Sequence, residues 1–526
     1  MSFLKKYISI FLGLFMLVYY ILLAWLIHRT GYEHSEALFH AEKIKLLFEA
    51  DENTLLTIGT TFPSIVFLSS VVFTPFGYPF APVLASIVFT SLLFYMLMND
   101  FSKSSLPRRV FLPMLLLLFM FHPGILYAAA SGRGVAAIML FFYLVFRSLF
   151  RYYQTQTTFY LSMASIYLTC LVFCDFNFIW LLFAFFPFIF LVSLDGLKIN
   201  REQPPIIQYF ETLNNRSQRR KLVNRTVAIY IVIFLLPFGA LFLFRTLNYY
   251  HAGDATYFLT SQYANWHVTG SESIGSLIAT KYIDHTVIEQ HQMIYQVYVL
   301  LLTPLLILVF FLYKGNLYEL FTVLAPFILM AVVLIDVQKY ITIEYYLIFL
   351  ALALVSLCYY AGKKYKSKIL YPIIMAVTLL NIFTGIYYFK KTVDREEVSF
   401  FSTLKNVKQW KEERANSEEY ILAAYISDIT DDTHKILMDD AAAYKVMAHL
   451  RSLKPVIMPV NNNFITIAEN PKAGARFLCV AKDNNLLKSF TVLNEYNRTL
   501  MENRRQLSTK LMFETKNWAI YKVLND

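Results

Sequence analysis

Long apolar segments alternate with short polar ones from the N-terminus to about Lys391. Most of these segments are close to the roughly 20 residues that an α-helix needs to cross a bilayer. We expect the first of them to be retained as a membrane helix. The pattern predicts eleven membrane-spanning helices, near residues 6–28, 80–98, 110–126, 135–150, 157–174, 177–195, 226–246, 293–313, 317–336, 341–361 and 369–389.

A shorter apolar segment, residues 62–76, interrupts this series. It carries Pro63 and Pro75, so we expect a juxtamembrane or re-entrant helix there. With the N-terminus in the cytoplasm, this choice places 19 Lys and Arg residues on the cytoplasmic side and 6 in the outer loops. The positive-inside rule supports that topology. Counting the segment as a span would place Arg108 and Arg109 outside and reverse the helices that follow.

The chain after Lys391 has the composition of a soluble domain. Its alternating positions predict a helix over residues 441–453 and strands at residues 435–438, 455–458, 476–480, 511–514 and 518–523. We interpret the pair Asp439 and Asp440 as a turn and helix cap. The predicted fold class is mainly α, a polytopic helix bundle over residues 1–391 followed by an extracytoplasmic α/β domain over residues 392–526. Two large loops, residues 28–79 and 247–292, would lie on the same outer face.

Composition and charge agree with a membrane protein. Hydrophobic residues make up 57% of the 526, well above the roughly 45–50% of soluble domains. The net charge of +11 does not indicate nucleic-acid binding, because the basic residues lie beside the predicted spans. Four cysteines are too few for a disulfide scaffold, and the histidines show no HExxH or CxxC spacing typical of zinc sites.

One segment stands out chemically, the run GYEHSEALFHAEK at residues 31–43. From Ser35 its apolar positions recur at three- and four-residue spacing, which predicts an amphipathic helix at the membrane surface with Lys43 and Lys45 on its polar side. Ser35 would cap that helix, and Glu36 would lie in its first turn. The acids are therefore explained either as caps and solvated groups of a surface helix or as part of an active site.

Three segments together resemble the glycosyltransferase C (GT-C) superfamily of polyprenyl-linked sugar transferases. The first is the start of the chain: a helix, an outer loop opening with acidic residues, and an apolar segment ending in PFGYPFAPVLAS. The second is FHPGILYAAASGRGVAAIMLFFYLVFRSLFR, and the third is KILMDDAAAYKVMAHL with the later NNNFITIAENP. The resemblance implies an integral membrane enzyme, in a bacterial inner or plasma membrane, that works in cell-envelope glycan biosynthesis.

The resemblance also implies roles for individual residues. An acidic residue near the start of the first outer loop would be the base that deprotonates the acceptor; Glu36 matches by spacing, with Glu33 as the other candidate. The donor phosphate would need cations. Arg245 is the first candidate, because a guanidinium at that depth needs an anion unless it reaches the headgroups. Arg133 and Lys339 follow, and a salt bridge to Asp336 explains Lys339 equally well.

Other polar residues on the outer side are candidate substrate contacts, and each has a structural alternative. Asp175 lines the cavity or breaks a helix hairpin, and Trp266 with His267 stacks on sugar or anchors the interface. The remaining candidates are His34 and His40. No cofactor is required by the sequence, although some family members use a divalent cation such as Mg or Mn, held partly by the donor phosphate.

The predicted function is transfer of a sugar, with inversion, from a polyprenyl-phosphate donor to a lipid, glycan or protein acceptor on the outer face. A polymerase or ligase moving a whole glycan from a lipid diphosphate is the alternative of similar shape. A lipid-linked sugar transporter is the third possibility, which predicts related halves and charged residues at mid-span. The charges instead collect at the outer ends of the spans, which favours an enzyme.

Overall fold

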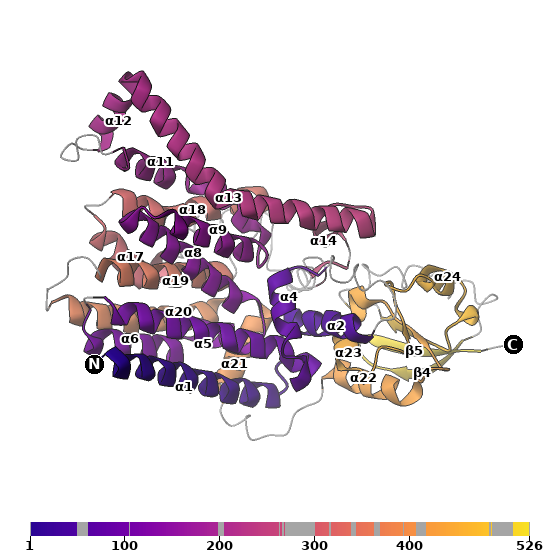
Figure 1. The fold of residues 1–526 in the computed structure, drawn as a ribbon. Coiled ribbons are helices and arrows are strands. Elements are labelled where there is room, and N and C mark those ends of the chain that lie inside the picture. The colour runs from indigo at the N-terminus through magenta and orange to yellow at the C-terminus, as the bar shows by residue number, and fades with distance from the viewer. Residues whose placement is uncertain are drawn as a thin grey trace.

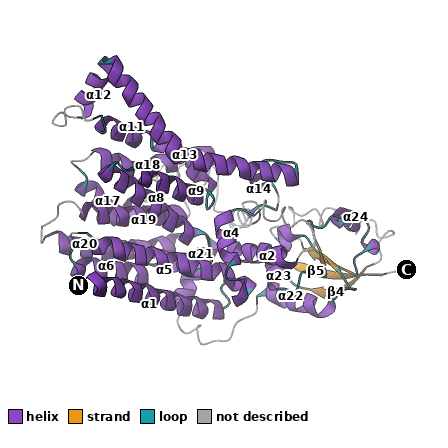
Figure 2. Cartoon of the chain, viewed as in Figure 1, coloured by secondary structure: helices purple, strands orange, loops and turns teal. Residues whose placement is uncertain are grey.

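A computed structural model of the chain describes residues 2–49, 61–104, 106–197, 205–261, 263–265, 268, 300–314, 317–337, 343–361, 369–392, 394–406, 417–482, 485 and 509–524. Helices dominate these residues, and the strands gather near the C-terminus (Figure 2). The long helices run side by side as a bundle, and the sheet lies beyond one end of it (Figure 1).

The helical part comprises long helices and several short 3-10 turns (η). Its elements are α1 Ser2–Arg29, α2 Ser35–Glu49, α4 Ser64–Val71, η1 Thr74–Phe76, η2 Tyr78–Phe80, α5 Ala81–Ser102, α6 Arg108–Phe121, α7 Pro123–Ala130, α8 Val135–Thr155, α9 Thr158–Val172, η3 Phe176–Trp180, α10 Leu181–Ala184, α11 Phe186–Asp195, α12 Pro205–Asn214, α13 Arg216–Ala252, α14 Tyr257–Thr260, α17 Pro304–Leu312, α18 Leu317–Val337, α19 Ile343–Ala361, α20 Leu370–Lys391 and α21 Arg395–Lys405.

Each of the eleven predicted spans coincides with helix in the described residues. Among the described residues, six helices are long and apolar enough to cross a membrane, or up to eight spans if each of two bent pairs counts as one. The pair α6 and α7 bends by 62° at His122, and the segment Phe176–Ala184, which comprises η3 and α10, makes a bend of 43° with α11. The remaining predicted spans correspond to α9, α17 and α18, whose described apolar stretches are shorter.

Apolar side chains cover the outside of the bundle as well as its core. Phe11 on α1, Leu235 and Phe242 on α13 and Phe383 on α20 are each at least 66% exposed. Contiguous apolar surface of this extent is unfavourable in water and suits contact with lipid tails. The chain is therefore an integral membrane protein. The predicted short segment before residue 80 forms the eight-residue α4 and the turn η1, too short to span a bilayer.

The C-terminal residues form a small α/β domain, as predicted. Its elements are α22 Glu418–Ile429, β1 Ile436–Leu437, α23 Asp440–His449, β2 Val456–Ile457, α24 Phe464–Glu469, η5 Pro471–Ala473, β3 Phe477–Ala481, β4 Thr509–Glu514 and β5 Trp518–Val523. The strand order is β2-β1-β3-β5-β4, with β1 parallel to β2 and β3 and the other neighbours antiparallel. All five predicted strands are confirmed.

The domain sits against α2, at the end of the bundle opposite the N-terminus (Figure 1). Apolar residues of α2, including Leu38 and Phe39, share one buried cluster with Ile436 and Tyr444 of the domain. The prediction that Lys43 and Lys45 lie on a side of α2 that faces water is wrong. Lys43 and Lys45 are buried, since the side expected to be solvated is covered by the domain.

Candidate functional site

Glu36 lies in the first turn of α2, where the chain enters the helix. Its Oε1 accepts a hydrogen bond from the Gly134 backbone N–H at 3.2 Å, and its Oε2 lies 3.4 Å from Arg133 Nε. His40 is one helical turn further on, with Nε2 3.8 Å from Oε1. Burial alone would raise the pKa of Glu36, but His40 and the Arg133 guanidinium lower it to about 2. Glu36 is therefore ionised at neutral pH.

The turn Ser131-Gly-Arg-Gly between α7 and α8 approaches α2 closely because two of its residues lack a side chain. Gly132 has φ +77°, and a Cβ there would lie 2.8 Å from the Cβ of Ala37. A Cβ on Gly134 would lie 2.8 Å from Val66 and 3.3 Å from Glu36 Oε1. The glycines thus bring a backbone donor and the Arg133 side chain to the same carboxylate.

Arg133 is contacted by carboxylates from three separate parts of the chain. Its Nη2 pairs with Glu344 Oε1 of α19 at 2.6 Å, in addition to the contact with Glu36. Its Nη1 lies 4.0 Å from Glu397 Oε1 of α21 and donates to the Tyr127 hydroxyl at 3.5 Å. A guanidinium can hold several acceptors at once through its fixed fork of donors. Arg133 therefore joins α2, α8, α19 and α21 at one point.

Glu397 differs from the other acids around Arg133. Its side chain is 1% exposed and accepts hydrogen bonds from Thr392 and Tyr388. Burial, with a further contribution from Asp394, raises the pKa of Glu397 to about 8. Near pH 7 it is therefore mostly protonated, and the Nη1 side of Arg133 faces less negative charge than the number of carboxyl groups suggests.

His34 fixes the start of α2. Its Nδ1 accepts a hydrogen bond from the Glu36 backbone N–H at 3.1 Å, so the proton of the neutral ring sits on Nε2. Nε2 lies 2.8 Å from Glu396 Oε2 and 2.8 Å from the Tyr127 hydroxyl. Ser35 was expected to cap the helix, but its hydroxyl and its N–H donate to Glu396 instead. Ser35 is already the first residue of α2, so His34 occupies the capping position before it.

Glu33 and the acids further along α2 face the C-terminal domain. Glu33 Oε2 lies 2.9 Å from His449 Nε2 of α23. Lys43 Nζ lies 2.6 Å from Asp440 Oδ2 and 3.2 Å from Glu42 Oε2. Asp439 caps α23, as predicted for the pair. The domain is therefore attached to the helix that carries Glu36 by buried ion pairs.

Of the remaining predicted site residues, two lie within the described residues and the others outside them. Asp175 caps η3 by accepting from the Asn177 N–H, which agrees with its interpretation as a helix breaker. The side chain of Arg245 is exposed on α13. Lys339, Trp266 and His267 lie outside the described residues.

Three acids around Arg133 and His34 were not predicted from the sequence: Glu344, Glu396 and Glu397. Glu344 begins α19, and the adjacent pair opens α21 directly after the last predicted span. The available signal was that these acids lie at ends of spans that the predicted topology places on one face of the bundle. Among the described residues, no group of three His, Cys, Asp or Glu side chains is arranged to hold a metal ion.

No protein-family model and no curated protein sequence matches the chain. Among solved structures, the chain is similar to the crystal structure of ArnT from Cupriavidus metallidurans bound to undecaprenyl phosphate. The identity is 10%, the similarity covers 97% of this chain and 97% of that one, and the TM-score is 0.47. No residue of the Glu36 cluster is assigned a role by this likeness.

Proposed function

We propose that this protein is a GT-C-type membrane glycosyltransferase that transfers a sugar from a polyprenyl-phosphate donor to an acceptor hydroxyl, with Glu36 as the general base. The observation that carries the proposal is the fixed, ionised carboxylate of Glu36. It is held by the Gly134 N–H and by Arg133. The exposed fraction of the side chain is 12% for Glu36 and 30% for the nearby Glu396.

In the proposed reaction, the acceptor oxygen forms a bond to the anomeric carbon while the bond from that carbon to the phosphate oxygen breaks. The electron pair leaves with the polyprenyl phosphate, and the acceptor proton passes to Glu36. Attack on the face opposite the leaving group inverts the anomeric centre. A carboxylate whose pKa is about 2 is too weak a base to ionise a free alcohol, so proton transfer must accompany C–O bond formation, when the hydroxyl becomes acidic.

Arg133 has two proposed roles. Its Nε faces the Glu36 carboxylate and its Nη2 pairs with Glu344, so Arg133 fixes the position of Glu36 relative to α19. Its Nη1 side is available to the donor phosphate, because Glu397 is mostly protonated near pH 7 and lies 4.0 Å away. A phosphate there would accept a charge-assisted hydrogen bond, which is stronger than one between neutral groups.

The proposal is tested with purified protein in lipid and a panel of radiolabelled polyprenyl-phosphate sugars. Glu36→Gln should lower turnover by about 10²- to 10⁴-fold while donor binding is retained, as expected for loss of a general base. Glu469→Gln, an exposed acid on α24, is the matched control. Glu33→Gln should lower turnover far less than Glu36→Gln, because Glu33 contacts His449 of the C-terminal domain and would act only through the position of α2. Full activity of Glu36→Gln would remove this residue from the mechanism, and no transfer from any sugar phosphate would favour glycan ligation or transport.

A further inference from the structure

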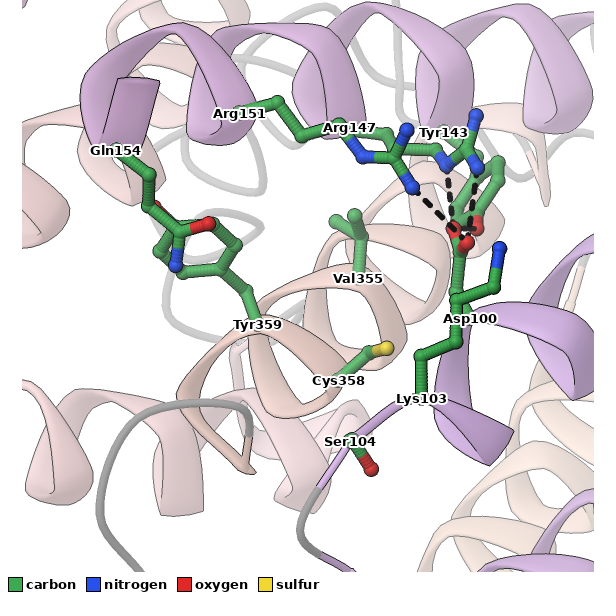
Figure 3. Close-up of a pocket in the computed structure, with 10 residues that line it drawn as sticks. All are labelled: Asp100, Lys103, Ser104, Tyr143, Arg147, Arg151, Gln154, Val355, Cys358 and Tyr359. Carbon is green, nitrogen blue, oxygen red and sulfur yellow. Dashed lines mark hydrogen bonds and ion pairs between the residues drawn. The ribbon is translucent and has the colours of Figure 1, made fainter.

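A cavity of about 130 Å³ lies at the opposite end of the bundle from Glu36, where α5, α8 and α19 end (Figure 3). The same three helices begin near the Glu36 cluster: Arg133 precedes α8, Glu344 opens α19, and Gly132 lies against Val83 of α5. A helix of about 20 residues is roughly 30 Å long, so the cavity and the cluster lie at opposite faces of the membrane. The cavity therefore has no part in the proposed transfer.

Three cationic side chains and one carboxylate line this cavity. The carboxylate of Asp100 is already engaged: Arg147 donates to it through Nε and through Nη2, the latter at 2.8 Å. Arg151 Nη2 donates to the same group at 3.3 Å, and the Tyr143 hydroxyl donates as well. Lys103 adds a third cation. One negative charge thus serves as counter-ion for three positive ones, and the lining keeps a net positive charge.

Several of these cationic groups have donors that are not used within the described residues. Lys103 is exposed and has no ion pair there, and Arg147 Nη1 has no hydrogen-bond partner there. Arg151 uses only Nη2 for Asp100, while its guanidinium lies 5.8 Å from the ring centre of Tyr160. In Figure 3 the charged ends of the three cations gather around Asp100, on one side of the cavity. These donors have no protein acceptor among the described residues.

We propose that this cavity binds a phosphate group, carried either by the headgroup of an acidic phospholipid or by a small soluble phosphate. Its volume is about ten times the roughly 10–15 Å³ that a single water requires, enough for a tetrahedral anion. Basic pockets between membrane helices on the cytoplasmic side suit anionic headgroups, and the predicted topology places this end of the bundle in the cytoplasmic leaflet. Arginine side chains hold phosphate oxygens by charge-assisted hydrogen bonds.

The test compares two double variants of the full chain in neutral detergent. Lys103→Gln/Arg151→Gln removes two cations of the cavity and leaves the pair of Asp100 with Arg147. Arg220→Gln/Lys221→Gln, two exposed positions of α13, makes the same change in net charge away from the cavity. Native mass spectrometry measures retention of phosphatidylglycerol against phosphatidylcholine. Thermal unfolding in inorganic phosphate, against chloride at equal ionic strength, measures binding of a soluble anion.

A cation near an anionic headgroup contributes about a 5-fold factor, so the cavity variant should bind phosphatidylglycerol about 25-fold more weakly while the α13 variant stays near wild type. Phosphate-specific stabilisation that the cavity variant alone loses would instead identify a soluble ligand. If the double variant does not fold, Lys103→Gln alone should give about a 5-fold loss, because this side chain is exposed. Equal losses in both double variants would overturn the proposal. It would also be overturned if the wild type neither prefers phosphatidylglycerol to phosphatidylcholine nor is stabilised more by inorganic phosphate than by chloride.

Discussion

The buried pair of Lys43 and Asp440 is expected to hold the C-terminal domain on α2. Both residues are at most 6% exposed, and Nζ lies 2.6 Å from Oδ2. Glu42 lies beside the same ammonium at 3.2 Å, but burial raises the pKa of Glu42 to about 8, so it is mostly neutral at pH 7. Asp440 therefore carries the counter-charge of Lys43, and Asp440→Asn leaves a buried ammonium without an ionised partner.

Removing one partner of a buried ion pair costs about 3–5 kcal/mol. Here the cost should fall near the lower end, about 3 kcal/mol, because Asp440 is one of the causes of the raised pKa of Glu42. Once Asp440 is neutral, Glu42 can ionise more readily and replace part of the lost attraction. Lys43→Met should cost a similar amount, since it leaves Asp440 buried and unpaired. The double variant should cost little more than either single one.

Hydrogen exchange of the full chain in lipid nanodiscs measures this prediction, because peptides from α23 and β1 report the local opening free energy of the domain. The four proteins of the double-mutant cycle should give a coupling of about 2–3 kcal/mol. Distant, independent sites are additive within about 0.3–0.5 kcal/mol. A coupling free energy no larger than this additivity error would refute the assignment of Asp440 as the counter-ion of Lys43.

Three further predictions concern the same region. Glu42→Gln should remove a pH dependence: between the ordinary pKa of about 4.5 and the raised value of about 8, the native state binds one more proton than the opened state. Stability at the domain interface therefore falls by about 1.4 kcal/mol per pH unit as pH rises, and exchange at pH 5 and 7 should show this slope in wild type only. Gly134→Ala should lower turnover by up to about 100-fold with little loss of donor affinity, because the new Cβ forces Glu36 or Val66 to move; Gly239→Ala, in open space, is its kinetic control. Arg133→Lys should also lower turnover, since an ammonium cannot reproduce the fork that contacts Glu36 and Glu344 together, and wild-type rates would contradict this.

The sequence was most informative where one local pattern decides the structure. Apolar segment length located the helices of all eleven predicted spans, and two-residue alternation located all five strands of the terminal domain. The break at His122 inside the third span was not predicted. A bend of 62° there depends on Pro123, and the buried imidazole bonds to Tyr346, which is distant in the sequence. Such a partner cannot be read from local periodicity.

The candidate site was predicted only in part, for a related reason. Glu36 and Arg133 were proposed from separate segments of the sequence, and the structure brings them within 3.4 Å. Glu344, Glu396 and Glu397 were missed because each is an ordinary acid at the start of a helix, where a favourable helix dipole explains it fully. The burial of Lys43 was missed because its counter-ion, Asp440, lies 397 residues away in the sequence. Without that partner, a lysine on an amphipathic helix is expected to face water.

The C-terminal domain has a physical reason to be part of the proposed active site. Glu36 lies on a 15-residue helix, close to the length at which an isolated helix is only marginally stable in water. One side of α2 contacts the glycine turn at Gly134, and the other is covered by α23 through Lys43 and Glu33. A base must stay within a few tenths of an ångström of its productive position. Holding α2 from both sides supplies that precision, so weakening the domain contact should reduce turnover even though the domain lends no group to the chemistry.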